Sequence, residues 1–169
     1  MTTTTNTLET FAATCHDILK SEPGPEGRAK VAAALEAALK DETFVAANCL
    51  DGGPERKVLY EDPDMGFCIL AHVYEDARES GPHDHGPSWA IYGQARGETI
   101  MTEWEVVEPA TPEIPGKVRG VRVYSLMPGM AQVYNEGQLH SPKREGPTRL
   151  IRIEGRNMDG VHRLAYKPV

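Results

Sequence analysis

After residue 54 the sequence is a succession of short β-type runs separated by turn residues, and this alternation constrains the fold most. Runs rich in β-branched and aromatic residues, bounded by Gly, Pro, Asn and Asp, are typical of strands. Many short strands with regular turns predict an antiparallel sandwich or barrel. We expect strands near residues 56–61, 67–74, 82–85, 89–94, 98–107, 118–126, 131–134, 149–154 and 162–166.

The first 50 residues follow a different pattern, because their apolar residues recur at helical spacing. Two prolines and two glycines in residues 21–27 interrupt the first helix, and residues 28–40 consist of strong helix formers. A short third helix is expected over residues 41–50. These helices are too short to form a domain alone. We therefore expect one structural domain, with a helical segment over residues 1–50 packed on a β-barrel over residues 51–169.

Charge and apolar patterning limit the partners that we expect. The chain has a formal net charge of −7 and no dense basic stretch, so we expect no nucleic acid. No apolar run approaches the roughly 20 residues that cross a bilayer, and the first residues lack the pattern of a signal peptide. Three scattered cysteines fit reduced thiols. We expect a cytoplasmic protein that does not contact a membrane.

Two of the six histidines form the element His83-Asp84-His85. In a strand, alternate side chains point to one face, so both imidazoles are predicted to face the same way. The pattern is weak in isolation, because surface histidines produce it by chance. His140 follows a short strand and the turn NEGQ, and an antiparallel barrel can bring it beside the pair. Three imidazoles can bind a metal ion and leave open positions, whereas three structural or surface histidines are the alternative.

The segment GPHDHGPSWAIYGQARGETIMTEW, followed by VYNEGQLH, resembles the cupin superfamily. Within it, the match is to the thiol dioxygenases, of which cysteine dioxygenase is the best-known member, and it covers roughly residues 55–166. The resemblance implies a mainly β fold, the cupin double-stranded β-helix or jelly roll, with two or three N-terminal helices packed outside the barrel. It also implies that His83, His85 and His140 bind the metal. Ordinary cupins add a glutamate ligand where Ala90 stands here, and its loss is characteristic of thiol dioxygenases.

A late strand departs from that family. Where thiol dioxygenases commonly carry Ser-x-His-x-Tyr, this chain has Leu150, Arg152 and Glu154, which strand alternation still points inward. We expect Arg152 and Glu154 to act in catalysis from the pocket wall, and a purely structural ion pair is the alternative. The arginine that binds the substrate carboxylate in cysteine dioxygenase aligns near Arg56 and Lys57. Lys57 has the closer register, although lysine offers a point charge rather than a bidentate fork.

Aromatic residues near the histidines are further candidates. We expect Tyr92 to act in catalysis and Trp89 and Tyr134 to contact substrate, although strand aromatics more often only pack. His72 is expected to be a hydrogen-bonded core or rim residue.

The resemblance implies a non-haem Fe²⁺-dependent dioxygenase that uses O₂ to oxidise a small thiol-bearing carboxylic acid to a sulfinate. Arg152, with Lys57 or Arg56, would then hold the carboxylate. A second hypothesis is a cupin lyase, isomerase or hydrolase that uses Zn²⁺, Mn²⁺ or Ni²⁺ as a Lewis acid, with Glu154 as base. A third is a non-catalytic module that binds a metal or a small molecule. A homodimer is compatible with the family, although the sequence identifies no interface strand.

Overall fold

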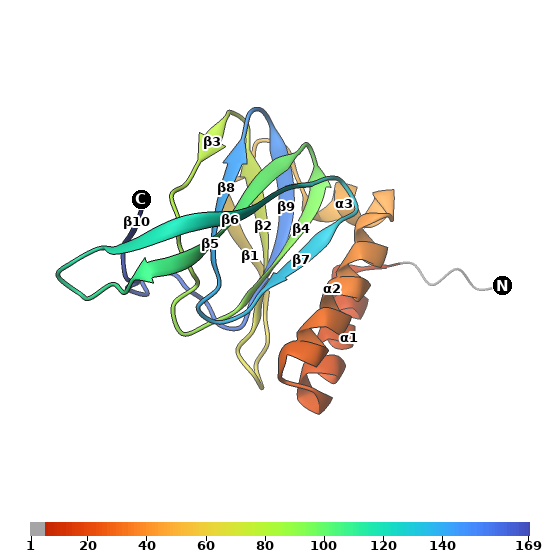
Figure 1. Cartoon of the computed structure of the whole chain (residues 1–169). Helices are drawn as coiled ribbons and strands as arrows, with labels where there is room; N and C mark the ends of the chain where they lie inside the picture. The colour runs from red at the N-terminus through yellow and green to blue at the C-terminus, as the bar shows by residue number, and fades with distance from the viewer. Residues whose placement is uncertain (1–5) are drawn as a thin grey trace.

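The computed structural model describes residues 6–169, so residues 1–5 of the predicted helical segment lie outside the described part. Within it, three helices precede ten strands (Figure 1). The helices are α1 (Leu8–Ser21), α2 (Pro25–Leu39) and α3 (Glu42–Asn48). The strands are β1 (Arg56–Glu61), β2 (Cys68–Tyr74), β3 (Arg78–Glu79), β4 (Ala90–Arg96), β5 (Thr99–Glu108), β6 (Gly116–Leu126), β7 (Ala131–Tyr134), β8 (Leu139–Arg144), β9 (Thr148–Glu154) and β10 (Tyr166–Pro168).

The strands form two five-stranded sheets that face each other as a jelly roll. One sheet has the order β1-β2-β9-β4-β7 and the other has the order β10-β6-β5-β8-β3. Strands far apart in the sequence are neighbours, such as β2 with β9 and β5 with β8, and both of these pairs are antiparallel. The helices lie outside the barrel, against the first sheet (Figure 1). The predicted mainly β jelly roll with external N-terminal helices is confirmed.

The three central strands of the first sheet, β2, β9 and β4, are buried on both faces. Ile69, Ile91 and Ile151, from its three central strands, belong to one apolar core with Leu35 of α2 and Phe44 of α3. Because side chains alternate along a strand, the even-numbered residues of β2, β4 and β9 point the other way, into the barrel. The helices therefore cover the outer face and leave the inner face to line the barrel interior.

The helices begin and end close to the positions that their sequences predict. The backbone N–H of Thr10 donates to the hydroxyl of Thr7, 3.1 Å away, which caps the start of α1. α2 begins at Pro25, inside the segment predicted to be a break. Proline is well suited to the first position of a helix, where its missing N–H would have no helical partner. Of the residues described, no helix combines the length and the apolar composition needed to cross a bilayer.

Residues 82–85, predicted as a strand, form a loop instead. A single antiparallel bridge between His83 and His140 joins this loop to β8. Pro82 has no N–H to donate to a ladder, and Gly86 has a φ of 57°, which bends the chain away from an extended path.

Other strands also differ from the prediction. Residues 139–144, which lie outside the predicted strands, form β8, because this stretch pairs with β5. The last strand lies at Tyr166–Pro168 rather than at 162–166, where it pairs with β6 in parallel.

Candidate metal centre

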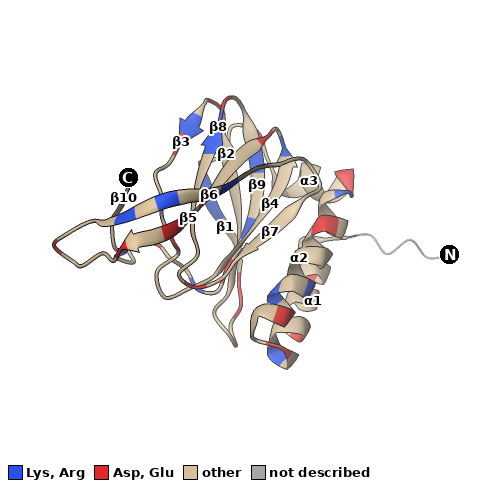
Figure 2. Ribbon diagram, in the orientation of Figure 1, with Lys and Arg blue, Asp and Glu red and all other residues tan. Residues whose placement is uncertain are grey.

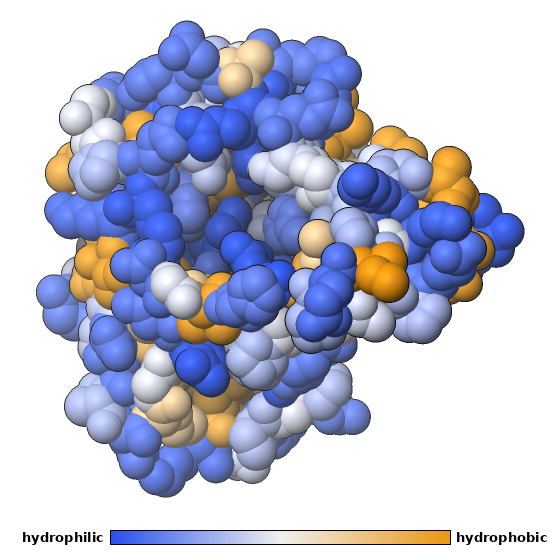
Figure 3. Space-filling view, turned by 90° about the vertical axis from the view of Figure 1, so that its left-hand side faces the viewer, coloured by the Kyte–Doolittle hydropathy of each residue, from blue (hydrophilic) through white to orange (hydrophobic). Residues whose placement is uncertain are grey.

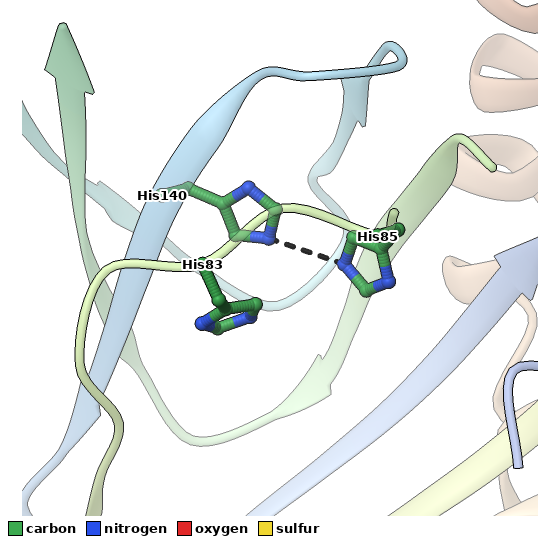
Figure 4. A group of neighbouring side chains, drawn as sticks. All are labelled: His83, His85 and His140. Atoms are coloured by element: carbon green, nitrogen blue, oxygen red, sulfur yellow. Dashed lines mark hydrogen bonds between the residues drawn. The ribbon is translucent and has the colours of Figure 1, made fainter. Parts of the chain in front are cut away.

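Three histidines from two distant segments meet inside the barrel (Figure 4). His83 and His85 stand on the loop between β3 and β4, and His140 is the second residue of β8. The backbone N–H of His83 donates to the carbonyl of His140 at 3.0 Å, and the N–H of His140 donates back at 2.9 Å. This bridge places the loop beside β8. One ring nitrogen from each histidine lies within 4.8 Å of the other two.

Backbone carbonyls determine which ring nitrogen carries the proton in two of the histidines. Nδ1 of His83 lies 2.8 Å from the carbonyl oxygen of Gly81, and Nδ1 of His140 lies 2.9 Å from that of Gln138. Because a carbonyl oxygen can only accept, each Nδ1 carries the hydrogen and donates it. The Nε2 lone pairs of both rings are therefore free to bind a cation, and the carbonyls hold the rings in place.

The third imidazole faces the second at short range. Nε2 of His85 lies 3.2 Å from Nε2 of His140, and its buried Nδ1 has no hydrogen-bond partner, with a carboxylate oxygen of Glu154 3.9 Å away. The Tyr92 hydroxyl lies 3.0 Å from the first Nε2 and 3.1 Å from the second, but it has one proton to donate. A bound cation would interact directly with the ring-nitrogen lone pairs that face this point.

The geometry and the charge state of this cluster fit a metal ion. Metal–imidazole bonds are about 2.0–2.1 Å long, so neighbouring ligand nitrogens lie about 3 Å apart, close to the separation between His85 and His140. Burial lowers the pKa of His83 to about 4 and holds the pKa values of His85 and His140 well below the usual range. All three rings are therefore neutral near pH 7, which is the form that binds metal. The three histidines can hold a metal ion of the Fe²⁺, Zn²⁺, Mn²⁺ or Ni²⁺ type.

A cavity of about 670 Å³ opens beside the cluster, and His83 and His85 are among the residues that line it. The molecular face seen in Figure 3 is hollowed near its centre, and the rim of this hollow is mostly hydrophilic. Basic residues occur on several strands of the barrel, including β8 and β9 (Figure 2). Guanidinium groups outnumber carboxylates on the cavity wall, which therefore favours anions. The charged lining residues are Arg56, Arg144, Arg152, Arg163, Glu154 and Asp159.

Arg152 and Glu154 both line this cavity, but their contact is loose. Nη1 of Arg152 lies 3.7 Å from Oε1 of Glu154, beyond hydrogen-bond distance, and Nε of Arg152 has no hydrogen-bond partner. The guanidinium carbon lies 4.2 Å from the ring centre of Tyr92. Oε2 of Glu154 is also buried without a hydrogen-bond partner, 3.7 Å from a nitrogen of Arg56. Both side chains therefore retain hydrogen-bonding capacity for a ligand.

The other predicted residues lie at different distances from the cluster. Arg56 lines the cavity and donates to Asn157 at 2.9 Å. Lys57 does not reach the cavity, because strand alternation turns it toward a separate small cavity beside the residues after α3. Trp89 packs on the helix side, and Tyr134 lies behind His140, with the two rings stacked 4.1 Å apart. Lys57, Trp89 and Tyr134 are thus not among the residues that line the cavity.

Several residues of the cavity wall were not predicted as site residues from the sequence, among them Arg144, Tyr74 and Arg163. Arg144 lies four residues after His140 on β8, so strand alternation puts both on one face. Pro142 and Gly146, which are typical of turns, hide this alternation in the sequence. His72, expected to be a core or rim residue, is buried and lines the cavity beside Tyr74. Arg163 comes from the loop before β10, and no local pattern marks it.

Two facing sheets thus enclose three imidazoles, two from the H-x-H loop and one from a later strand. The chain has the cupin fold. Ala90 of β4 is fully buried, and its methyl group offers no atom that could bind a metal. Over residues 6–169, the group of side chains able to hold a metal contains histidines alone.

No family model matches the sequence, and no curated protein matches it. Solved structures with a similar fold include KdgF from a Halomonas species, at 18% identity and a TM-score of 0.46, covering 66% of this chain and 91% of that one. A double-stranded β-helix protein from Klebsiella pneumoniae has 17% identity and a TM-score of 0.47, covering 70% and 84%. A cupin-2 domain protein from Shewanella frigidimarina has 14% identity and a TM-score of 0.43, covering 62% and 82%.

Proposed function

We propose that this protein is a non-haem Fe²⁺-dependent dioxygenase that oxidises a small thiol-bearing carboxylic acid to a sulfinate with O₂. The observation that carries this proposal is a cluster of three neutral imidazoles, with no carboxylate ligand, beside a cavity wall rich in arginine. A site without an anionic ligand keeps the full positive charge of a bound metal for the substrate. A thiolate that also carries a carboxylate suits both that charge and the arginines.

His83, His85 and His140 would hold the iron from one side. When bound there, Fe²⁺ supplies open coordination positions at which a thiolate and O₂ can be brought together. Conversion of the thiolate to a sulfinate puts both atoms of O₂ on sulfur, and sulfur supplies all the electrons that O₂ takes up. The reaction therefore needs no separate reductant.

The chain's own side chains would orient the substrate. Arg152 lies next to Tyr92, whose hydroxyl is within 3.1 Å of two of the imidazoles, so a carboxylate on its guanidinium would sit close to the metal centre. The loose contact between Arg152 and Glu154 supports this role, because a guanidinium tightly paired with a carboxylate would have fewer N–H donors available for a substrate. Arg56, which lines the cavity, would help Arg152 to bind the substrate carboxylate in place of Lys57.

The test is metal analysis of protein purified under mild reducing conditions, followed by oxygen-uptake assays of the Fe²⁺-loaded protein with a panel of thiol acids. We expect iron, thiol-dependent oxygen uptake and a sulfinate product. His140→Gln should lose both metal and uptake, whereas His162→Gln, a change at an exposed histidine outside the cavity wall, should keep both. Iron binding without uptake for any thiol acid would overturn the proposal.

A second candidate rests on Glu154, whose buried Oε2 has no hydrogen-bond partner. Such a carboxylate can act as a general base in a lyase, isomerase or hydrolase that uses Zn²⁺, Mn²⁺ or Ni²⁺ as Lewis acid. Purification with one of these metals, and no thiol-dependent uptake after loading with iron, would favour it. Ligand-induced stabilisation without any turnover would instead indicate a binding module.

A further inference from the structure

We infer that the cavity contains a second anion-binding subsite, formed by Arg144 and His72, so that the substrate carries two carboxylates rather than one. This inference rests on the proposed function for the thiol, and it adds the class of acid that the cavity accepts. The subsite lies farther along the inner sheet face than Arg152.

The register of the first sheet gives the order of these groups. Across β2, β9 and β4, Leu70, Arg152 and Tyr92 form one row, and His72 lies in the next row, opposite Leu150. Successive rows on one face of a sheet are about 7 Å apart. Arg152 therefore lies in the row of Tyr92, which contacts the imidazoles, and His72 lies one row farther from the metal.

Arg144 reaches the same region from the opposite sheet. Its guanidinium carbon lies 4.8 Å from the ring centre of Tyr74, and the Tyr74 hydroxyl is 3.1 Å from Nδ1 of His72. Nε of Arg144 donates to the hydroxyl of Thr99 at 3.2 Å, which holds the guanidinium in place. Two sheets thus present a cation and an imidazole to one part of the cavity.

Both groups keep a buried polar atom without a partner. Nη2 of Arg144 and Nε2 of His72 have no hydrogen-bond partner, and the two residues are only 2% and 3% exposed. A buried guanidinium is costly unless an anion compensates it. Among the lining residues, Glu154 and Asp159 are the only carboxylates, and the described residues show no ion pair between either of them and Arg144. An anionic group of the ligand fits this place.

Arg152 stands in the row of Tyr92, whereas the Arg144–His72 subsite combines the next row with a residue of the opposite sheet, so we assign each guanidinium its own carboxylate. In a thiol acid with two carboxylates on adjacent carbons, each carboxylate can face its own guanidinium, because both long arginine side chains extend from the wall toward the ligand. The structure thus predicts a preference for dicarboxylic thiol acids over monocarboxylic ones.

The first experiment compares mercaptosuccinate with 3-mercaptopropionate, which differ by one carboxylate. We expect kcat/KM of the iron-loaded protein to be at least about tenfold higher for the diacid. Arg144→Met should lower the value for the diacid at least about tenfold more than for the monoacid. Arg119→Met, a change at an exposed arginine of the β5–β6 hairpin, should leave kcat/KM unchanged for both acids. Equal kcat/KM for the two acids in the wild-type protein would overturn the inference.

The second experiment does not depend on turnover. Calorimetric titration of the metal-free protein should show tighter binding of succinate than of butyrate, and Arg144→Met should remove the difference. If succinate is preferred but no thiol acid is oxidised, the proposed function fails and the subsite stands. If thiol acids are oxidised without any preference for diacids in either experiment, the subsite fails and the proposed function stands. If Arg144→Met does not fold, the preference of the wild-type protein for diacids over monoacids still tests the inference.

Discussion

The Nε2 atoms of His85 and His140 face each other at 3.2 Å, and the Tyr92 hydroxyl lies within 3.1 Å of both. In the metal-free protein, the Tyr92 hydroxyl can donate a hydrogen bond to one of these two nitrogens. A bound ion would take over that role, because it binds the lone pairs directly. Tyr92 therefore matters more to the metal-free protein than to the metal-loaded one.

Tyr92→Phe should lower the free energy of unfolding of the metal-free protein by about 1–3 kcal/mol, because it leaves a buried lone pair without a donor. In the zinc-loaded protein, the same substitution should lower the free energy of unfolding by a smaller amount. Urea unfolding of both forms measures the difference. Tyr166→Phe, a matched change on the cavity wall, should have little effect in either form. An equal loss with and without zinc would contradict the assigned role.

The stability of the metal-free protein should depend on pH through its buried histidines. Burial lowers the pKa of His83 to about 4 and holds the pKa of His140 well below its usual value. The unfolded chain therefore takes up protons as the pH falls through about 6.5, whereas the folded chain does not until the pH reaches about 4 at His83. Each such histidine lowers the free energy of unfolding by up to about 1.4 kcal/mol per pH unit across this window.

Urea unfolding between about pH 7 and about pH 5 tests this dependence. We expect the urea concentration at the unfolding midpoint to decrease steadily as the pH is lowered. In His83→Asn, this midpoint should depend less steeply on pH. The carboxyl of Glu136, whose pKa is lowered by the hydrogen bond from Arg28, should contribute only at lower pH. A midpoint that does not change over this range would show that the rings are not held neutral.

Gly93 allows α2 to approach the sheet. A Cβ at this position would lie 2.6 Å from Cδ2 of Leu35, 2.9 Å from Cδ1 of Leu39 and 3.0 Å from the carbonyl oxygen of Ile151. Because the carbonyl belongs to the sheet, the helix would have to move. Gly93→Ala should lower the free energy of unfolding by about 1–3 kcal/mol, as measured by urea unfolding.

Gly146→Ala is the matched control, since a Cβ there meets no atom within 4 Å and Gly146 is not among the glycines with positive φ. Its effect should lie between neutral and a gain of about 1 kcal/mol. If the two variants had equal stability, close packing of α2 at Gly93 would not be the cause.

Arg28 ties α2 to the turn between β7 and β8. Its guanidinium makes two bonds of 2.7 Å to the carboxylate of Glu136 and lies 5.2 Å from the ring centre of Trp89. Glu136 is about half exposed, so solvent weakens the pair. Arg28→Met should cost about 1–2 kcal/mol in thermal or urea unfolding.

Lys30→Met, which removes a solvent-exposed ion pair with Glu22, should change the stability by less than about 0.5 kcal/mol. The pKa of Glu136, followed by NMR, should rise toward its usual value in Arg28→Met alone. An unchanged pKa would show that the ion pair does not form in solution.

Local sequence patterns were sufficient for most secondary structure and for the three histidines. Strand alternation and turn residues act over a few positions, so they indicated a β-rich fold after residue 54, and helical spacing indicated the helices before it. The prediction failed where a local signal was ambiguous. Pro25 can break a helix or begin one, and residues 141–147 contain turn residues that β5 nevertheless holds as strand up to Arg144.

Which further residues join Arg152 and Glu154 on the cavity wall was decided by the tertiary structure. Lys57 and Arg56 are neighbours in sequence, yet only Arg56 lines the cavity, because the pairing of β1 with β2 determines which face each of them takes. Arg144 and His72 come together from opposite sheets, and no local pattern predicts which strands will face each other. The sequence by itself determined which residues could bind a metal, since their types and spacing are local. Their convergence, and the arginines beside them, depend on contacts between distant strands that form only in the folded chain.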